Sequence, residues 1–200
     1  MSVGEPRTSV RRIVVGISGA SAPQLGIACL AALREIGGIE THLVISEGAR
    51  RTIPLEANLE VDQVEELADA CYEPRDLAAP IASGSFRTMG MIVIPCSMRV
   101  LAAVATGNSG DLLARAADVT LKERRPLVLV CREAPLSLIH LRNMETVTLA
   151  GATVLPPVLA FYHQPKSVDD VVAQIVGKAL DQFDIQHDLY RRWSAAPLEQ

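Results

Sequence analysis

Small, hydroxyl and basic residues follow four apolar runs of this chain. The segments are Gly16-Ile17-Ser18-Gly19-Ala20-Ser21, Ser46, Pro95-Cys96-Ser97-Met98-Arg99 and Arg132-Glu133. Small residues let a backbone approach a ligand closely, hydroxyls donate hydrogen bonds to phosphate, and an arginine holds phosphate through paired N–H groups. Together the four segments predict a site for a phosphorylated, nucleotide-like ligand.

Each segment also has an ordinary interpretation when it is considered alone. The first can be a tight strand-to-helix turn, and it lacks the Gly-x-Gly-x-x-Gly pattern of dinucleotide-binding folds. Ser46 and Ser97 can be helix caps, and Arg99 can be a solvated side chain. Cys96 has no histidine nearby in the sequence that would support a role as a nucleophile.

Alternating strands and helices are expected to position these segments. Apolar runs predict buried strands over residues 13–17, 41–45, 91–95, 127–131 and 153–155. Apolar spacings of three and four predict a helix capped by Ser21, helices over about 61–70, 98–105, 110–121 and 136–150, and a last one striped from Val168 to Phe183 and capped by Ser167.

This order of elements predicts an α/β fold. We expect a doubly wound, mainly parallel sheet with helices on both faces, arranged in three Rossmann-like layers. In such sheets ligands bind outside the carboxyl ends of the strands, which is where the four segments fall.

The bulk composition narrows the class of protein. The chain has 200 residues, 49% of them hydrophobic, and a net charge of −4, which predicts one well-buried domain and no surface for nucleic acid or membrane insertion. We predict a disordered leader over residues 1–10, a single domain over 11–193 and a tail over 194–200. Four scattered cysteines indicate reduced thiols in a cytoplasmic protein and no metal site; they are Cys29, Cys71, Cys96 and Cys131.

The same residues resemble those of the UbiX/Pad-type flavin prenyltransferases. The likeness extends over about residues 11–193, and its most specific segments are 16–21, Ala-Ser-Gly-Ser (82–85), 95–97, 103–107, 115–130, 132–135 and Phe-Tyr-His-Gln-Pro (161–165). The resemblance implies a metal-independent enzyme that joins the dimethylallyl group of dimethylallyl phosphate to N5 and C6 of reduced FMN. It also implies a homo-oligomer, typically a dodecamer with sites between subunits, and a UbiD-type decarboxylase that receives the prenyl-FMN.

The resemblance further implies roles for particular residues. Those expected at FMN are Gly19, Ala20, Ser21, Ser46, Ser97, Met98, Arg99, Val100 and Arg132. Those expected at dimethylallyl phosphate are Lys122, Tyr162, Lys178 and Trp193. Ser21, Glu56 and Glu133 are the expected catalytic residues, because closing the new ring removes a proton from C6 and needs a positioned base.

Two positions depart from the family pattern. Gly-Ala-Ser-Gly-Ala is usual in the family, but residues 19–23 read Gly-Ala-Ser-Ala-Pro, so Ala22 is strained if its position needs a positive φ. Lys178 stands where the family has arginine, and lysine lacks the two-pronged grip on phosphate. Both changes bear on the prenyl donor more than on flavin binding.

Three other functions use parts of the same pattern. A flavin-dependent cysteine decarboxylase would share the fold but needs a histidine shortly before the strand at 91–95, and residues 83–90 contain none. For a direct aromatic-acid decarboxylase, the sequence supplies no catalytic machinery beyond the flavin. A non-enzymatic FMN carrier or chaperone for a decarboxylase is the remaining alternative, and the altered residues 22–23 and Lys178 keep it open.

Overall fold

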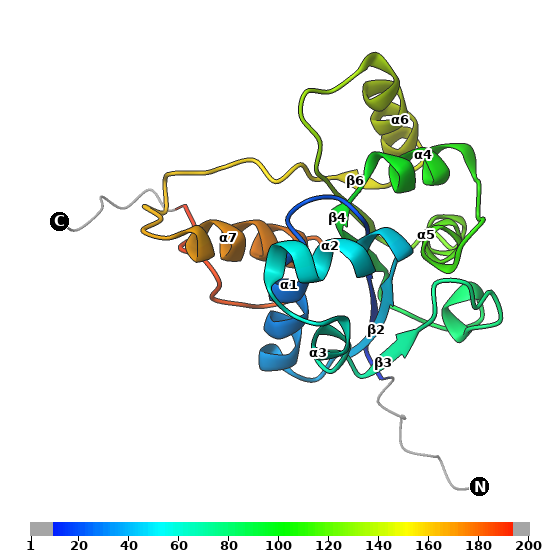
Figure 1. The fold of residues 1–200 in the computed structure, drawn as a ribbon, viewed down its shortest axis with the longest axis horizontal. Coiled ribbons are helices and arrows are strands. Elements are labelled where there is room, and N and C mark those ends of the chain that lie inside the picture. The colour runs from blue at the N-terminus through cyan, green and yellow to red at the C-terminus, as the bar shows by residue number, and fades with distance from the viewer. Residues whose placement is uncertain (1–9, 194–200) are drawn as a thin grey trace, which may run out of the picture.

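Six parallel strands form one sheet at the centre of the fold (Figure 1). In the computed structural model, which describes residues 10–193, they are β1 (Arg12–Ile17), β2 (Glu40–Ile45), β3 (Ala70–Tyr72), β4 (Met91–Cys96), β5 (Leu127–Cys131) and β6 (Thr153–Val154). The strand order is β3-β2-β1-β4-β5-β6, and every pair is parallel. The predicted doubly wound sheet is therefore confirmed, and its order reverses between β1 and β4, the position at which such sheets bind ligands.

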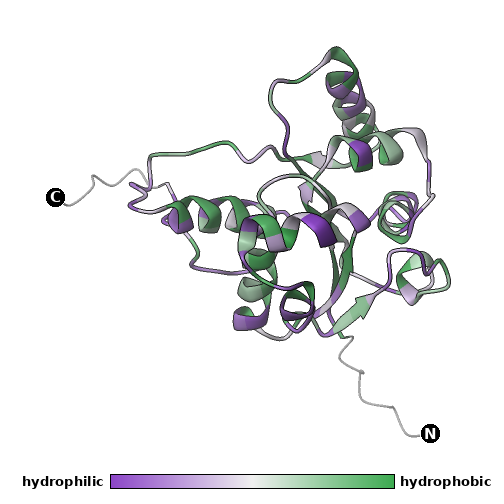
Figure 2. Ribbon diagram, in the orientation of Figure 1, coloured by the Kyte–Doolittle hydropathy of each residue, from purple (hydrophilic) through white to green (hydrophobic). Residues whose placement is uncertain are grey.

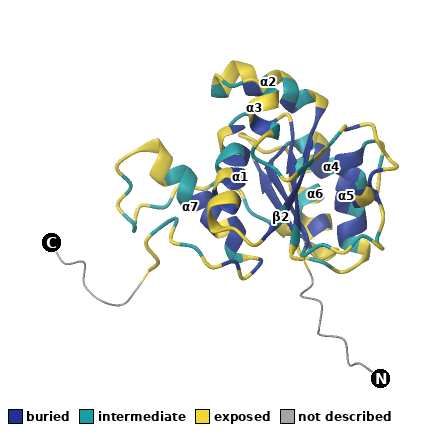
Figure 3. Cartoon of the chain, turned by 90° about the horizontal axis from the view of Figure 1, so that it is seen from below, coloured by how far each residue is buried: buried dark blue, intermediate teal, exposed yellow. Residues whose placement is uncertain are grey.

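Helices cover both faces of this sheet (Figure 3). Helices α1 (Gln24–Ile36) and α7 (Val168–Asp181) lie on one face, and α4 (Met98–Thr106), α5 (Leu112–Lys122) and α6 (Leu138–Leu149) lie on the other. Helices α2 (Glu47–Ala57) and α3 (Val61–Glu65) extend the first layer, and a 3-10 turn at Pro80–Ala82 packs beside α5. The three predicted layers are all present.

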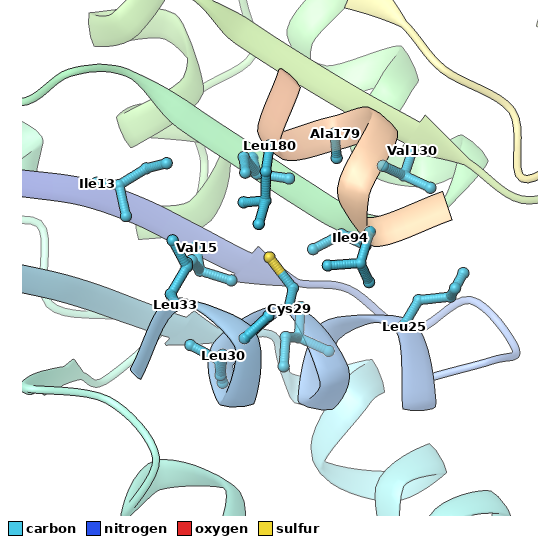
Figure 4. Packing of buried hydrophobic residues seen from close by; sticks show 14 of the residues in the cluster. Ile13, Val15, Leu25, Cys29, Leu30, Leu33, Ile94, Val130, Ala179 and Leu180 are labelled. Carbon is cyan, nitrogen blue, oxygen red and sulfur yellow. The ribbon is translucent and has the colours of Figure 1, made fainter. Parts of the chain in front are cut away.

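Two apolar cores hold the layers together, one on each side of the sheet. On the first side, Cys29 and Leu33 of α1 point toward Val15 and Ile94 of the sheet and Leu180 of α7 (Figure 4). The helices are apolar toward the sheet and more polar on their outer faces, as the predicted periodicity requires (Figure 2). Burial of whole strands such as β4 follows from this double cover.

Several predicted elements were confirmed and a few details were wrong. Ser167 caps α7 by accepting a hydrogen bond from the Asp170 N–H at 3.1 Å, as expected. Ser21 is not a helix cap, because α1 begins only at Gln24. Val168 is 78% exposed and so does not belong to the buried stripe of its helix. The helix predicted over 61–70 ends at Glu65, and strand β3 follows where only irregular chain was expected.

The ends of the chain limit two further predictions. The predicted leader, apart from residue 10, and the predicted tail over 194–200 lie outside the described residues. Between residues 10 and 193, no helix has both the length and the apolar character needed to cross a bilayer. In that same range, no three His, Cys, Asp or Glu side chains are grouped as metal ligands would be.

Candidate active site

The buried hydroxyl of Ser18 joins the loop after β1 to the loop after β4. Its Oγ donates to the Pro95 carbonyl oxygen at 2.8 Å and accepts from the Ser97 N–H at 2.7 Å. These bonds fix the backbone that carries residues 19–21 on one side and Ser97 on the other. Ser18 is a functional residue that was not predicted from the sequence, although a hydroxyl at the end of a buried strand needs a partner of this kind.

Two glycines bring the loop after β1 against the first turn of α2. A Cβ atom added at Gly19 would lie 2.8 Å from the Gly48 Cα, so the two backbones can approach this closely only without side chains. Ala20 is buried beside them at 8% exposure. The contact places the predicted flavin loop next to Ser46, which is itself buried at 6% exposure.

Ser46 and Ser97 cap helices that begin at the carboxyl edge of the sheet. Ser46 accepts from the Ala49 N–H at 3.2 Å, and Ser97 accepts from the Val100 N–H at 3.4 Å. A capping hydroxyl uses only its oxygen lone pairs, so each of these serines keeps its own proton for a ligand. Being a cap and binding a phosphate are therefore compatible roles.

The Ser21 hydroxyl donates to Glu56, a residue 35 positions further along the chain. The distance from Ser21 Oγ to Glu56 Oε2 is 2.8 Å, and the Ala22 N–H donates to the same oxygen at 2.9 Å. These two bonds, with a smaller contribution from the charge of Arg132, lower the pKa of Glu56. Glu56 is therefore ionised at neutral pH, and Ser21 presents its free lone pairs to any N–H group beside it.

The loop after β5 completes this group of residues. The Arg132 N–H donates to the Cys96 carbonyl oxygen at 3.1 Å, and its exposed side chain lies within electrostatic range of Glu56. Glu133 is exposed at the same edge, where its carboxylate accepts from the Ala134 N–H at 3.1 Å. The structure thus brings Ser21, Glu56 and Arg132 together from three separate segments.

The first turn of α4 holds the other residues expected at FMN. Arg99 is 79% exposed and lies 3.7 Å from Asp111, whereas the Val100 side chain is buried in the core. The side chain of Met98 is half-buried. A cavity of about 270 Å³ lies between α4 and the start of α5, with Arg99 and Val100 among its lining residues.

Ala22 adopts the left-handed conformation that the sequence comparison with the family brought into question. Its φ is +70°, in the region where a Cβ atom meets the following carbonyl group. The hydrogen bond from its N–H to Glu56 holds the residue there. The positive φ that would make alanine unfavourable at this position is therefore present.

Replacing Ala22 with glycine is expected to stabilise the protein. A left-handed alanine costs ~1–2 kcal/mol, which glycine would avoid. Glycine also has more conformational freedom in the unfolded chain, which lowers the free energy of unfolding by ~0.5–1 kcal/mol, so the net stabilisation is ~0.5–1 kcal/mol. The unfolding temperature of a chain this long should then rise by ~1–4 °C. Ala150→Gly is the matched control, because Ala150 ends α6 with a φ of −73° and gains no relief. An unchanged unfolding temperature in Ala22→Gly would show that position 22 stores no strain.

Three residues expected at the prenyl donor make their described side-chain contacts with residues other than Ser21. The rings of Tyr162 and Trp193 meet edge to face, with centroids 5.8 Å apart. Lys178 lies on α7, where its Nζ is 3.7 Å from the Asp181 carboxylate. Figure 1 shows the segment after β6 running to the far end of α7, away from the sheet.

Lys122 lies at the opposite edge of the sheet from Ser21. It is the last residue of α5, which leads into the amino end of β5, and Figure 3 shows α5 lying lengthwise along the sheet. Its Nζ contacts Glu123 Oε1 at 2.6 Å and lies beside Gly84. A six-residue strand such as β1 spans ~20 Å, which is too far for one lysine side chain to cover.

The chain is similar to known proteins over nearly its whole length. A family model described as Flavoprotein matches residues 3–180. The flavin prenyltransferase UbiX of Escherichia coli K12 is 50% identical over 94% of this chain and 100% of its own length. The structure of AnUbiX (PadA1) in complex with FMN and dimethylallyl pyrophosphate matches with a TM-score of 0.91 and 52% identity, over 94% of this chain and 99% of that one. A dodecameric FMN-dependent UbiX-like decarboxylase from Escherichia coli O157:H7 matches with a TM-score of 0.89 and 50% identity, over 92% of this chain and 100% of that one.

Proposed function

Because the chain belongs to the UbiX-type flavin prenyltransferases of the flavoprotein family, we propose that it joins the dimethylallyl group of dimethylallyl phosphate to N5 and C6 of reduced FMN. The observation that carries this proposal is a hydrogen bond at the carboxyl edge of the sheet. Ser21, on the glycine-lined loop after β1, donates it to the ionised carboxylate of Glu56 on α2. A flavin carrier would need the loop and the basic residue, but it would not need this proton acceptor.

The residues at this edge fit FMN. Helices α2 and α4 begin there behind Ser46 and Ser97, so their free N–H groups and partial positive charge favour a phosphate. Gly19 and Ala20 hold the loop after β1 close against α2 at this edge, and the exposed side chain of Arg132 supplies a cation. Together with residues 98–100 they would hold the cofactor. When bound, reduced FMN supplies the electron-rich N5 and C6 atoms that take the prenyl group.

Ser21 and Glu56 are proposed to move the proton that leaves the N5 position. The Ser21 Oγ donates its own hydrogen to Glu56, so its lone pairs are free to accept a hydrogen bond from an N–H group. The proton can then pass through the hydroxyl to the Glu56 carboxylate. Glu133, exposed at the end of β5, is the proposed base for the second proton, at C6.

Neighbouring copies are proposed to complete the site. Lys122 lies at the opposite edge of the sheet from Ser21 in one chain, so we propose that the two meet in a homo-oligomer, a dodecamer like the relative from Escherichia coli O157:H7. Helix α6 supports this assembly, since Val147 alone is buried there while four large apolar side chains are exposed; these are Leu138, Ile139, Leu141 and Leu149. The cations Lys122 and Lys178 would stabilise the charge on the leaving phosphate without a metal.

The product is proposed to serve a second enzyme. Prenyl-FMN is a modified cofactor, so a UbiD-type decarboxylase that binds it is the expected recipient.

The compartment and the form of the donor are proposed as well. The four cysteines are all free thiols, which supports a location in the reducing cytoplasm. The structure of AnUbiX contains the pyrophosphate form of the donor, and we propose that this chain takes the monophosphate.

An anaerobic reaction tests the function. We expect purified protein, incubated with reduced FMN and dimethylallyl phosphate, to release a flavin heavier by one five-carbon unit, as measured by mass spectrometry. Reactions without the donor, or with oxidised FMN, are the controls and should return FMN of unchanged mass. Tightly bound but unmodified FMN in the complete reaction would favour the carrier alternative. Release of carbon dioxide from an aromatic acid by this protein alone would favour direct decarboxylation.

A further inference from the structure

Asp181, the last residue of α7, accepts hydrogen bonds from three side chains that follow it in the sequence. Tyr190 donates its hydroxyl to Oδ2 at 2.6 Å, and Arg192 donates to Oδ1 at 2.7 Å and to Oδ2 at 3.2 Å. His187 Nε2 lies 3.1 Å from Oδ1. We call Lys178, Asp181, His187, Tyr190 and Arg192 the Asp181 cluster. The Gln182 N–H already caps α7 by donating to the Ala179 and Leu180 carbonyl oxygens, so the contacts of Asp181 are additional to those that end the helix.

The local sequence lets the chain fold back tightly along α7. A Cβ atom at Gly177 would lie 2.6 Å from the Tyr190 ring and 2.7 Å from the His187 ring, so only glycine fits there. The His187 side chain is 1% exposed, and the Leu189 N–H donates to its Nδ1 at 3.3 Å. Nε2 therefore carries the ring proton and donates it to the Gly177 carbonyl oxygen and to Asp181.

The way the chain folds back along α7 affects the position of Trp193. It follows Arg192 directly, and its ring meets that of Tyr162 edge to face at 5.8 Å although Trp193 is 77% exposed. An exposed aromatic has little burial to hold it, so its position depends on the paired hydrogen bonds between Arg192 and Asp181 one residue earlier. The Asp181 cluster therefore determines whether Trp193 faces Tyr162.

The cluster also acts on Lys178. A lysine is a point charge on a flexible stem, and a carboxylate three residues later on a helix limits the positions of its ammonium group. Asp181 is already paired with Arg192, so the net charge of the cluster stays positive and Lys178 remains available to an anion. Although burial opposes it, hydrogen bonds from Arg192 and Tyr190 lower the pKa of Asp181 to about 2, which keeps the carboxylate ionised.

We propose that Asp181 is a positioning residue for the prenyl donor: it holds Trp193 against Tyr162 through Arg192 and Tyr190, and it aligns Lys178. The proposal rests on the proposed function, which assigns Tyr162, Lys178 and Trp193 to the donor. It also gives a structural role to lysine at position 178, since a fixed carboxylate supplies the orientation that an arginine would carry in its own planar group.

Asp181→Asn in the full chain tests this proposal with two independent readouts. The KM for dimethylallyl phosphate is expected to rise ~10-fold while kcat and FMN affinity change by less than about threefold, because ground-state positioning of the donor is what is lost. Trp193 is the only tryptophan of the chain, so its fluorescence reports its position without any substrate. We expect greater quenching by acrylamide and a shifted emission maximum. Tyr190→Phe, which removes one hydrogen bond, should move both readouts the same way to a smaller extent.

Asp169→Asn is the matched control, because Asp169 is exposed on the same helix and belongs to no part of the cluster. It should leave both readouts at the wild-type values. The proposal is overturned if Asp181→Asn leaves KM and fluorescence unchanged, or if FMN affinity falls as much as donor affinity, which would indicate a general structural role. If wild-type protein binds FMN but transfers no prenyl group, the proposed function fails and this proposal falls with it. If the wild-type protein transfers the prenyl group normally and Asp181→Asn leaves the Trp193 fluorescence unchanged, only the proposal for Asp181 is overturned.

Discussion

Replacing Glu56 with glutamine is expected to slow prenyl transfer by ~10²–10³-fold, the usual contribution of a positioned proton acceptor. Glutamine keeps the shape of the side chain and can still accept hydrogen bonds from the Ser21 hydroxyl and the Ala22 N–H. It cannot take up a proton at neutral pH. The loop should therefore remain in place, and FMN affinity is expected to stay within about twofold of the wild-type value.

Single-turnover transfer under anaerobic conditions measures this rate, and titration with FMN measures the affinity. Glu35→Gln on α1 is a suitable control, since Glu35 is an exposed carboxylate without a partner in the proposed mechanism. Hydrogen bonds from Ala22 and Ser21 lower the pKa of Glu56 below its ordinary 4.5, so protonation of this group should not slow the wild-type enzyme between neutral pH and about pH 4.5. A Glu56→Gln enzyme with the wild-type rate would remove Glu56 from the mechanism.

Much of the architecture was predictable because local patterns and the tertiary fold agree. Helix α7 shows this best: Ser167 and the acidic first turn mark its start, and the apolar spacing marks its buried face. The prediction failed at Val168, which the pattern included but the first turn of the helix leaves in solvent. Strand β3 was missed because three half-exposed residues carry no periodic signal.

The candidate site was predictable only in part, for a different physical reason. Residues of the four loops could be found because parallel strands bring their carboxyl ends to one edge. The bond from Ser21 to Glu56 crosses 35 residues, and nothing local to either residue announces it. The same holds for the buried hydroxyl of Ser18, whose partners lie 77 and 79 residues away. Such contacts depend on how α2 packs over the loop after β1, which is a tertiary result.

Lys122 shows what the order of elements adds to residue matching. The resemblance assigns Lys122 to the prenyl phosphate, yet the end of α5 and the loop after β1 lie at opposite edges of the sheet. The family segments themselves divide in the same way: 82–85 lies beside Lys122, whereas 16–21, 95–97 and 132–135 lie at the other edge. The proposed assembly satisfies both facts, because each site would take its flavin loops from one copy and its Lys122 from another.

Mixing two inactive variants is therefore expected to restore activity. Ser21→Ala alone and Lys122→Met alone should each retain ~1% of the wild-type rate or less, since one loses the proton path and the other a cation for the leaving phosphate. In oligomers assembled at random from both chains, about a quarter of the sites would combine an intact Ser21 with an intact Lys122 from a neighbouring copy. Coexpression with two different affinity tags allows the mixed oligomers to be purified and assayed.

The same experiment with Ser21→Ala and Glu56→Gln provides the decisive contrast. The Ser21 hydroxyl bonds to Glu56 of its own chain, so no mixture of these two variants contains an intact pair, and activity should stay at the level of the single variants. Recovery in the first mixture and not in the second would assign Lys122 to a neighbouring copy. If neither mixture recovers although light scattering shows intact oligomers, Lys122 does not act across subunits. If Lys122→Met alone keeps the wild-type rate, Lys122 has no part in holding the donor, and the phosphate must rely on the cations of the Asp181 cluster.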